Sequence, residues 1–273
     1  MVMLDMVCRR FPAGEIIVAH FDQGIRANSE LDMEFVREMA AEYGVEFRSC
    51  RAELGAGASE AEAREKRYEF LMKVAAETGG EVWTAHHLDD LVETVTINFL
   101  RGTGWRGLTG LDRAGVRRPF LETEMFYESL DRAGIFEYAA KRRLRFREDP
   151  SNSWDEYLRN RVRQNLNNSP LRFEQKLEVW RLWKRQRDLR REIDEEVVGL
   201  LPEDGRFERE WFRELSESVA LEILRAVTLR AGVSATRPQL LDFWQAILTY
   251  GTGKSFNLPG DRLVKFGKEE FSL

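Results

Sequence analysis

Two adjacent histidines and two adjacent aspartates stand together in the stretch Thr84–Gly104, TAHHLDDLVETVTINFLRGTG. Side chains of these types hold metal ions, activate nucleophiles and bind nucleotides with magnesium, so three kinds of site must be compared. A zinc site needs several histidine, cysteine or carboxylate ligands at workable spacings. The chain has three histidines and two distant cysteines, with no CxxC or HxxxH pair, and adjacent His86 and His87 can hardly both face one ion. The composition therefore disfavours zinc.

A cysteine nucleophile is disfavoured because such a residue needs a base within hydrogen-bond reach. Cys8 is predicted in a buried helix and Cys50 at the end of a strand, and neither has a base nearby in the sequence. We interpret both as ordinary buried thiols. So few cysteines also exclude a disulfide scaffold and predict a cytoplasmic protein.

A nucleotide site fits the stretch better. A helix that begins at about Leu88 directs its free amides and the positive end of its dipole toward a phosphate. Asp89 and Asp90 would repel phosphate but suit Mg²⁺, which binds carboxylate and phosphate oxygens together. His86 lies four residues before Asp90 and could face the same site. An alternative stays open, in which Asp89 or Asp90 only caps the helix and both histidines are strand-end residues.

The elements around this stretch predict an α/β fold. Short apolar runs rich in β-branched or aromatic residues indicate strands at 15–19, 45–50 and 81–85, and amphipathic helices are predicted between them. Asn28 or Ser29 would cap the first helix and Ser59 the second. This alternation predicts a Rossmann-like parallel sheet with helices on both faces, in which ligands bind beyond the carboxyl ends of the strands. His20, Arg51 and His86 follow the three strands.

The second half of the chain has a mainly helical pattern. Residues 117–121, RRPFL, are predicted to be a connector, followed by helices at 122–143 and 172–201 and by mostly helical structure to Thr249. A hairpin is predicted around Pro259–Gly260. The GTGKS run at 251–255 resembles part of a phosphate-binding loop, but the helix and strand around it are in inverted order, so we interpret it as a turn. The predicted domains are residues 1–168 and 169–273.

The net charge of −5 is unevenly distributed. Residues 141–191 contain sixteen Lys/Arg and seven Asp/Glu, a net of +9, so the remainder carries −14. A basic segment in an acidic protein indicates a local contact with a polyanion. The alternative is a solvated helix face, and the sequence does not decide between them.

Eight segments taken in order resemble one family. They are AHFDQGIR, EAREKRYEFL, TAHHLDDLVET, FLRGTGWRGLTGL, RPFL, FREDPSN, RNRVR and GTGKSFNLPG. Together they resemble the tRNA(Ile)-lysidine synthetase family, ATP-pyrophosphatases of the adenine-nucleotide α-hydrolase fold. The resemblance implies an N-terminal catalytic domain and a helical tRNA-binding domain that ends in a hairpin.

The resemblance also implies a reaction and its participants. ATP adenylates C2 of the wobble cytidine in isoleucine tRNA with a CAU anticodon, and free L-lysine then displaces AMP to form lysidine. ATP and Mg²⁺ would be the cofactors, and the +9 segment would contact the tRNA backbone. The implied catalytic residues are His86, Asp89, Asp90 and Arg161, with both aspartates as metal ligands. The implied ATP-binding residues are His20, Arg26, Arg64, Arg67, Arg101 and Gly102, and the choice between Arg64 and Arg67 stays open.

Two departures from the family pattern have consequences. Asp22-Gln23 stands where the family has Asn-His, and the family's Ser-Gly-Gly-x-Asp-Ser loop would fall just before Met1. The chain as given lacks the pyrophosphate loop and should not turn over, so either the true start lies upstream or the chain is a defective fragment. We expect the upstream start, because the rest of the ATP-binding edge is retained. A catalytically inactive tRNA-binding remnant and a tRNA thiolase of the same fold are the alternatives, and the missing CxxC disfavours the thiolase. A homodimer is one open alternative for the oligomeric state.

Overall fold

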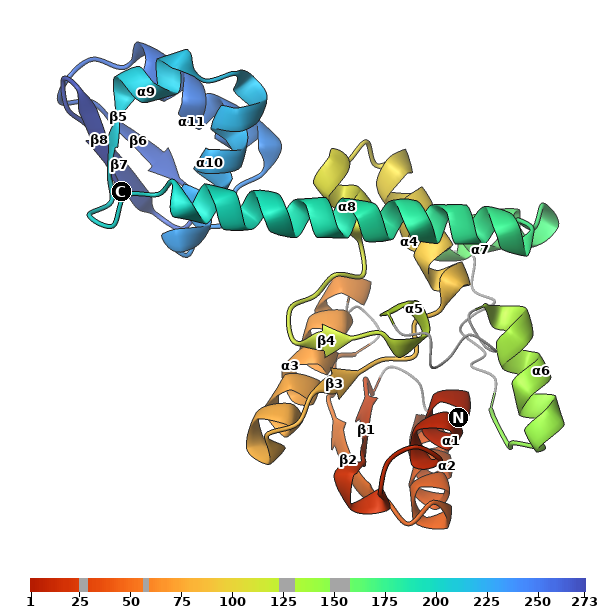
Figure 1. The fold of residues 1–273 in the computed structure, drawn as a ribbon. Coiled ribbons are helices and arrows are strands. Elements are labelled where there is room, and N and C mark those ends of the chain that lie inside the picture. The colour runs from red at the N-terminus through yellow and green to blue at the C-terminus, as the bar shows by residue number, and fades with distance from the viewer. Residues whose placement is uncertain (25–28, 56–58, 123–130, 148–157) are drawn as a thin grey trace. The chain divides into compact units, whose positions relative to one another are not determined.

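The computed structural model describes residues 1–24, 29–55, 59–122, 131–147 and 158–273. The chain forms two compact units, Met1–Gln186 and Arg187–Leu273, which divide inside the long helix α8 (Phe173–Gly199; Figure 1). The boundary predicted from the sequence lies earlier, at the end of α7 (Leu158–Asn168). The first half of α8 packs with the first unit because Trp180 and Trp183 donate indole hydrogen bonds to the carbonyls of Leu121 (2.8 Å) and Gly110 (2.7 Å).

The first unit alternates strands and helices before it becomes helical. In chain order its remaining elements are α1 (Val2–Cys8), η1 (Ala13–Glu15), β1 (Ile17–Asp22), α2 (Ser29–Glu42), β2 (Glu46–Arg51), α3 (Glu60–Thr78), β3 (Val82–Trp83), α4 (Leu88–Leu100), η2 (Trp105–Thr109), β4 (Val116–Arg117), α5 (Pro119–Glu122) and α6 (Arg132–Arg142). Local signals set several bounds as predicted. Ser59 caps α3 by accepting a hydrogen bond from Glu62 N (3.1 Å), and Gly44 and Gly79, both at φ 67°, follow the ends of α2 and α3.

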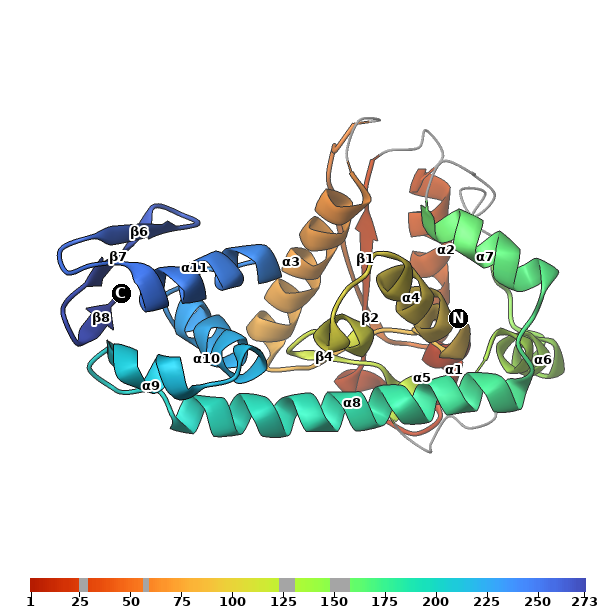
Figure 2. The same cartoon turned by 90° about the horizontal axis from the view of Figure 1, so that it is seen from above.

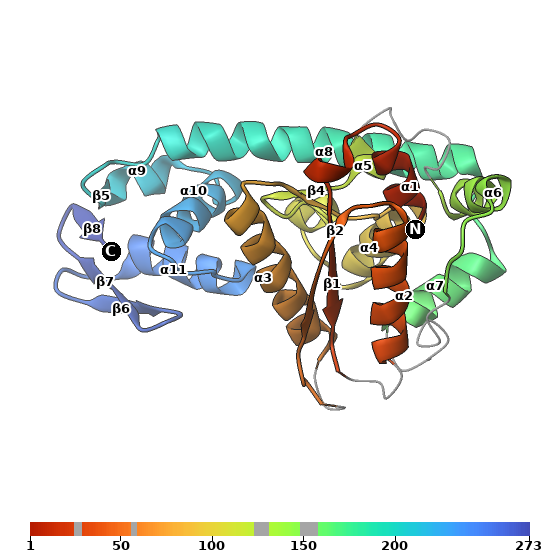
Figure 3. The same cartoon turned by 90° about the horizontal axis from the view of Figure 1, so that it is seen from below.

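The predicted parallel α/β fold is confirmed. β1 pairs with β2 from Ile17↔Glu46 to Asp22↔Arg51, and β3 pairs with β4 through Val82↔Val116; both pairs are parallel. Within the described residues no strand ladder joins the two pairs. Figures 2 and 3 show β1 and β2 between helices α2 and α3, so both faces of this pair are covered.

Two predictions in this unit need correction. The segment 117–121 is not a plain connector, because Arg117 belongs to β4 and Pro119 begins the short helix α5. A two-residue strand is too short to produce an alternating pattern, so no local signal indicated it. The helix predicted at 122–143 is shorter: α6 begins after Asp131, whose carboxylate accepts a hydrogen bond from Gly134 N (3.0 Å). Residues 123–130 of that prediction lie outside the described residues.

Small apolar clusters hold the first unit together. One joins α4 to α8 through Leu88, Leu91 and Trp183. Another packs Tyr68 of α3 on the β3–β4 pair. The second cluster fixes β3, which precedes the Thr84–Asp90 turn, and the first fixes the start of α4, which follows it, so packing holds both ends of the turn.

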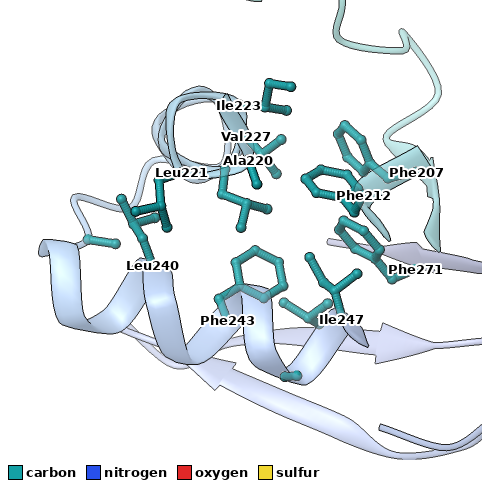
Figure 4. Close-up of a cluster of buried hydrophobic side chains, with 14 of the residues drawn as sticks. Phe207, Phe212, Ala220, Leu221, Ile223, Val227, Leu240, Phe243, Ile247 and Phe271 are labelled. Atoms are coloured by element: carbon teal, nitrogen blue, oxygen red, sulfur yellow. The ribbon is translucent and has the colours of Figure 1, made fainter. Parts of the chain in front are cut away.

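The second unit has one contiguous core (Figure 4). Its elements are β5 (Arg206–Glu208), α9 (Arg209–Glu214), α10 (Glu217–Arg230), α11 (Arg237–Thr249), β6 (Ser255–Leu258), β7 (Arg262–Phe266) and β8 (Glu270–Ser272). The strands form an antiparallel sheet in the order β5-β8-β7-β6, and the predicted hairpin is its β6–β7 part. The GTGKS run is a turn that leads into β6, with Gly253 N bonded to Phe266 O at 2.8 Å.

None of the helices in the described ranges is long and apolar enough to cross a membrane.

Candidate active site

The His-His-x-Asp-Asp turn lies between β3 and α4, at the carboxyl end of the β3–β4 pair. His87 is the N-cap of α4: its Nδ1 accepts a hydrogen bond from Asp89 N (3.2 Å), and Asp90 accepts one from His87 N (3.0 Å). This reciprocal arrangement satisfies two amides that a helix start leaves free. The sequence left open whether Asp89 or Asp90 only caps the helix. In the structure the N-cap is His87, and Asp90 completes the capping box.

Asp89 is tied to two other helices. One carboxylate oxygen accepts a hydrogen bond from Arg132 N (2.7 Å), and the other lies 2.8 Å from Lys176 Nζ on α8. Lys176 also contacts Asp131, the N-cap of α6, at 2.9 Å. Burial acts to raise the pKa of Asp89, but the neighbouring His87 side chain, the ammonium group of Lys176 and the Arg132 amide outweigh burial and hold the pKa well below the usual range. Asp89 is therefore ionised and joins α4 to α6 and α8.

His86 is an uncharged imidazole at neutral pH. Burial lowers its pKa to about 4; Asp90 acts in the opposite direction, and Arg118, Arg64 and Arg67 lower it further. Its Nδ1 lies 2.9 Å from the Thr84 hydroxyl. A neutral ring of this kind can donate and accept hydrogen bonds without adding charge to the site.

Arginines of α3 and the end of β4 gather near His86. The guanidinium groups of Arg64 and Arg67 lie 5.3 Å and 5.4 Å from the centre of the buried Tyr68 ring. Arg118, just after β4, is 1% exposed and donates to Val116 O at 3.1 Å. Both Arg64 and Arg67 therefore contact the Tyr68 ring, and the choice between them as the site residue stays open. The sequence did not single out Arg118 and carried no local signal for it, because the two-residue strand β4 before it could not be predicted.

Glu93, one turn beyond Asp90 on α4, is a buried carboxylate that the sequence reasoning also missed. Arg163 of α7 binds it in a bidentate manner (2.7 and 2.9 Å), and Arg159 Nε lies 3.6 Å away. A single charged residue in an otherwise uncharged run, VETVTI, was the available signal. The pair fixes α7 against α4.

Other predicted site residues lie apart from this turn. Arg101 and Gly102 are exposed at the far end of α4, roughly 18 Å along the helix from Asp90 at 1.5 Å per residue. His20 lies within β1, where burial lowers its pKa although Asp22 and Asp32 act against that shift. Arg161 is exposed on α7.

In the sequence, Arg26 and the Asp22-Gln23 pair lie near the end of β1. Arg26 lies outside the described residues. At the Asp22-Gln23 departure, buried Asp22 accepts hydrogen bonds from Gly24 N (2.9 Å) and the Ser29 hydroxyl (3.0 Å), so it anchors the start of α2.

Much of the basic segment 141–191 is neutralised inside the fold. Six of its cations pair with acids earlier in the chain: Arg142 with Asp5, Arg145 with Glu38 and Glu42, Arg147 with Asp32, Arg159 and Arg163 with Glu93, and Lys176 with Asp89 and Asp131. Neither alternative from the sequence anticipated this. Among the described residues, the exposed cations of the segment without an ion pair include Lys141, Arg143, Arg161, Arg172 and Arg185.

The described residues contain no group of three or more His, Cys, Asp or Glu side chains arranged to hold a metal ion. Both cysteines are free; Cys8 is half-buried in α1 and Cys50 is exposed in β2, so the thiol predicted to be buried at position 50 is not.

A family model described as a PP-loop domain matches residues 1–169, which include β1–β4 and the whole turn. The chain belongs to the PP-loop family.

This PP-loop chain resembles curated proteins named tRNA(Ile)-lysidine synthase. It is 39% identical over 157 residues to the one from Solibacter usitatus, covering 56% of this chain and 34% of that protein. It is 38% identical over 153 residues to the one from Ralstonia nicotianae (54% and 32%), and 40% over 147 residues to one from Thermus thermophilus (50% and 27%). The chain thus spans about a third of the length of these relatives.

A solved structure shares the fold. It is a U34-tRNA thiolase from Methanococcus maripaludis with its [4Fe-4S] cluster, with a TM-score of 0.51, 18% identity and coverage of 67% of each chain. At this identity the likeness concerns the fold alone.

Proposed function

We propose that this PP-loop protein ligates lysine to C2 of the wobble cytidine of isoleucine tRNA with a CAU anticodon. ATP would transfer its adenylyl group to the C2 oxygen with release of pyrophosphate, and the ε-amine of L-lysine would then displace AMP. The observation that carries the proposal is the match of the PP-loop half of the chain to curated lysidine synthases at 38–40% identity.

The chemistry of the turn supports a nucleotide at this edge. Neutral His86 and the arginines of α3 stand where parallel strands end, which is the usual ligand edge of such sheets. Arginine pairs well with phosphate because its planar donors match phosphate oxygens. His86 would hydrogen-bond the nucleotide, and Arg64 and Arg67 would contact its phosphates.

The two aspartates differ in their fitness to hold Mg²⁺. Both oxygens of Asp89 are engaged, by Lys176 and by Arg132 N, whereas Asp90 uses one oxygen for His87 N. Mg²⁺ commonly keeps several waters and uses one or two carboxylates with phosphate oxygens. The donor set therefore fits Mg²⁺ at Asp90, and Asp89 would position the turn; the sequence had predicted both as ligands. Bound Mg²⁺ would screen the charge of the phosphates.

The remaining assignments are proposals of the same kind. Exposed Arg161 would contact the tRNA backbone, with the other unpaired cations of 141–191. His20, Arg26, Arg101, Gly102 and a homodimer stay predictions.

Transfer of radiolabelled lysine to transcribed isoleucine tRNA in the presence of ATP tests the function. A transcript with a UAU anticodon is the matched control substrate. The 273-residue chain and a version extended through in-frame upstream codons are assayed together. Asp90→Asn is the site variant, and Asp188→Asn, at an exposed side chain of α8, is its control. We expect ATP-dependent labelling of the CAU transcript alone by at least one of the two versions, lost when that version carries Asp90→Asn and kept when it carries Asp188→Asn. If neither version labels the transcript, the proposed function is wrong.

A further inference from the structure

The carboxyl end of α4 exposes two large apolar side chains in succession. Phe99 is 73% exposed, the highest value for a large apolar residue in the described part of the chain, and Leu100 is 63% exposed. Single apolar residues scattered on a surface are ordinary, whereas adjacent ones form a patch that can mark a binding site. Arg101 follows them, is exposed, and makes no ion pair with any described residue. The end of α4 thus offers an aromatic ring and an unpaired cation within three successive residues.

The turn that follows α4 is held by its own hydrogen bonds and by close packing. The side-chain amide of Asn98 donates to Gly107 O at 2.6 Å, and Asn98 O accepts from the Thr103 hydroxyl at 3.0 Å. A Cβ atom at position 107 would stand 2.2 Å from the Thr103 hydroxyl oxygen, so only glycine fits there. The exposed side chains are therefore carried by a fixed base, which lowers the entropy lost when a partner binds them.

The chain around this turn contains no carboxylate. Residues 94–111 include no Asp or Glu and carry two arginines, Arg101 and Arg106. Helix α7, which packs against α4, also has no acidic residue and carries three arginines. Two of these pair with Glu93, and the third, Arg161, is exposed. In a chain with a net charge of −5, these two segments are suited to an anionic partner.

The residue types favour single-stranded RNA among anionic partners. Proteins bind unpaired bases by stacking them on exposed aromatic rings, while nearby arginines contact the phosphates. The short helix η2 adds a second ring of this kind, because the Arg106 guanidinium lies 4.8 Å from the centre of the half-buried Trp105 ring. Duplex RNA keeps its bases stacked inside the helix and would leave Phe99 unused. A purely apolar partner would gain nothing from the arginines.

We propose that Phe99, Leu100 and Arg101 form a contact surface for single-stranded RNA. One unpaired base stacks on the Phe99 ring, Leu100 extends the apolar surface, and Arg101 binds an adjoining phosphate. Phe99 lies roughly 14 Å along α4 from Asp90, at about 1.5 Å per residue, so the stacked base is a neighbour of the reacting nucleotide and not that nucleotide itself. This role differs from the ATP contact that the resemblance implied for Arg101. Assignment of the strand to the unpaired anticodon loop of tRNA rests on the proposed function.

Fluorescence anisotropy with a short, labelled single-stranded RNA tests the surface without any catalysis. The 273-residue chain is compared with Phe99→Ala, Phe99→Tyr, Arg101→Gln and the matched control Phe146→Ala. Phe146 is also a half-exposed aromatic residue between two arginines, but those arginines pair with Glu42 and Asp32. An RNA duplex and a strand of the same length without bases serve as comparison ligands.

The aromatic ring should determine the affinity. We expect the Kd for the single strand to be roughly tenfold or more weaker in Phe99→Ala and to be kept in Phe99→Tyr, because tyrosine still offers a ring for stacking. Phe146→Ala should bind like the parent. Arg101→Gln should reduce the slope of log K against log salt concentration by about 0.7, the value for one phosphate contact on a single strand. The strand without bases should bind weakly, and equally to the parent and Phe99→Ala.

Three results would overturn the proposal. The first is an equal Kd for the single strand in the parent, Phe99→Ala and Phe146→Ala, or no binding by the parent at low salt. The second is equally tight binding of the duplex that Phe99→Ala leaves unchanged, which would mean that backbone charge alone is recognised. The third is self-association that is lost in Phe99→Ala while the Kd for RNA stays the same, which would mean that a second copy covers the patch.

The melting temperature excludes an indirect effect on the fold. Phe99 is mostly exposed, so Phe99→Ala should melt at the temperature of the parent. If Phe99→Ala does not fold, the comparison of Phe99→Leu with Phe99→Tyr decides, because leucine is apolar but has no ring. Weaker binding in Phe99→Leu than in Phe99→Tyr supports stacking, and equal binding contradicts it.

RNA binding and lysine transfer are separate readouts. Binding that depends on Phe99 in a chain that forms no lysidine supports the surface and counts against the proposed function. Lysidine formation by a parent whose affinity for RNA is unchanged in Phe99→Ala leaves the proposed function standing and overturns the surface.

Discussion

Replacing Lys176 with methionine should destabilise the contact between α4 and α6, because it removes the ammonium group that binds both Asp89 and Asp131. Lys176 Nζ lies 2.8 Å from Asp89 and 2.9 Å from Asp131, and the three side chains are only 14%, 26% and 11% exposed. The two carboxylates share one ammonium group, so the oxygens that contact it are no more than about 5.7 Å apart. At an effective dielectric constant of about 20, two full charges at that distance repel by about 3 kcal/mol. We therefore expect Lys176→Met to lower the free energy of unfolding of the first unit by about 3 kcal/mol at pH 7.

The effect should depend on pH in a defined direction. The pKa of Asp89 lies below its usual value, so in the parent this group adds stability above about pH 4, its unfolded pKa, and loses it as the pH falls further. The pKa of Lys176 is raised, so the ammonium stays charged throughout this range. In Lys176→Met a carboxylate can take up a proton to relieve the repulsion. The difference between parent and variant should thus be largest near pH 7 and shrink below about pH 4.

Urea unfolding followed by tryptophan fluorescence measures this difference, because Trp180 and Trp183 lie on the same helix. Arg181→Met is the control on α8: its partner Glu178 and Arg181 itself are both mostly exposed, so the change should be within about 0.5 kcal/mol. Adding Asp131→Asn to Lys176→Met should restore part of the lost stability, because asparagine still caps α6 but carries no charge. A loss in Lys176→Met that is equal at pH 7 and below pH 4, or no recovery in the double variant, would refute the electrostatic reasoning.

Three further predictions concern other polar contacts. Arg163→Met should lower the free energy of unfolding by about 3 kcal/mol, because it leaves the buried carboxylate of Glu93 with a single, more distant arginine. A double-mutant cycle with Glu93→Gln should show a coupling energy above about 1 kcal/mol, and additive effects would contradict the prediction. Arg209→Met should lower the free energy of unfolding of the second unit by about 2–4 kcal/mol, because buried Arg209 donates hydrogen bonds to three main-chain carbonyls. Calorimetry that shows an unchanged unfolding transition of this unit would refute the prediction. Burial and a hydrogen bond to Asp5 raise the pKa of Tyr138 to about 12. Its contribution to folding stability is therefore complete below about pH 10 and is lost as the pH rises toward 12. Unfolding measured across that range should show this loss in the parent and not in Tyr138→Phe.

Local patterns in the sequence predicted most of the elements that carry the candidate site. Ser59 at the start of α3, Gly79 after its end and the turn around Gly260 act through neighbouring residues, so their effects can be deduced from spacing alone. The start of α4 at Leu88 was predicted for the same reason. The strand β4 could not be predicted, because only its pairing with β3 makes two residues a strand.

The charged residues show most clearly what the sequence could predict and what only the tertiary structure could show. Sequence alone located the His-His-x-Asp-Asp turn at a strand end, since strand and helix signals are local. It could not tell that Asp89 is held by Lys176, 87 positions later, or that most acids facing the basic segment come from much earlier in the chain. Ion pairs between distant residues leave no periodic trace, because only the folded packing brings their atoms within a few ångströms. The sequence therefore determined where the turn lies and which chemistry its residue types permit, and the tertiary structure decided which of its carboxylate oxygens are bonded within the fold.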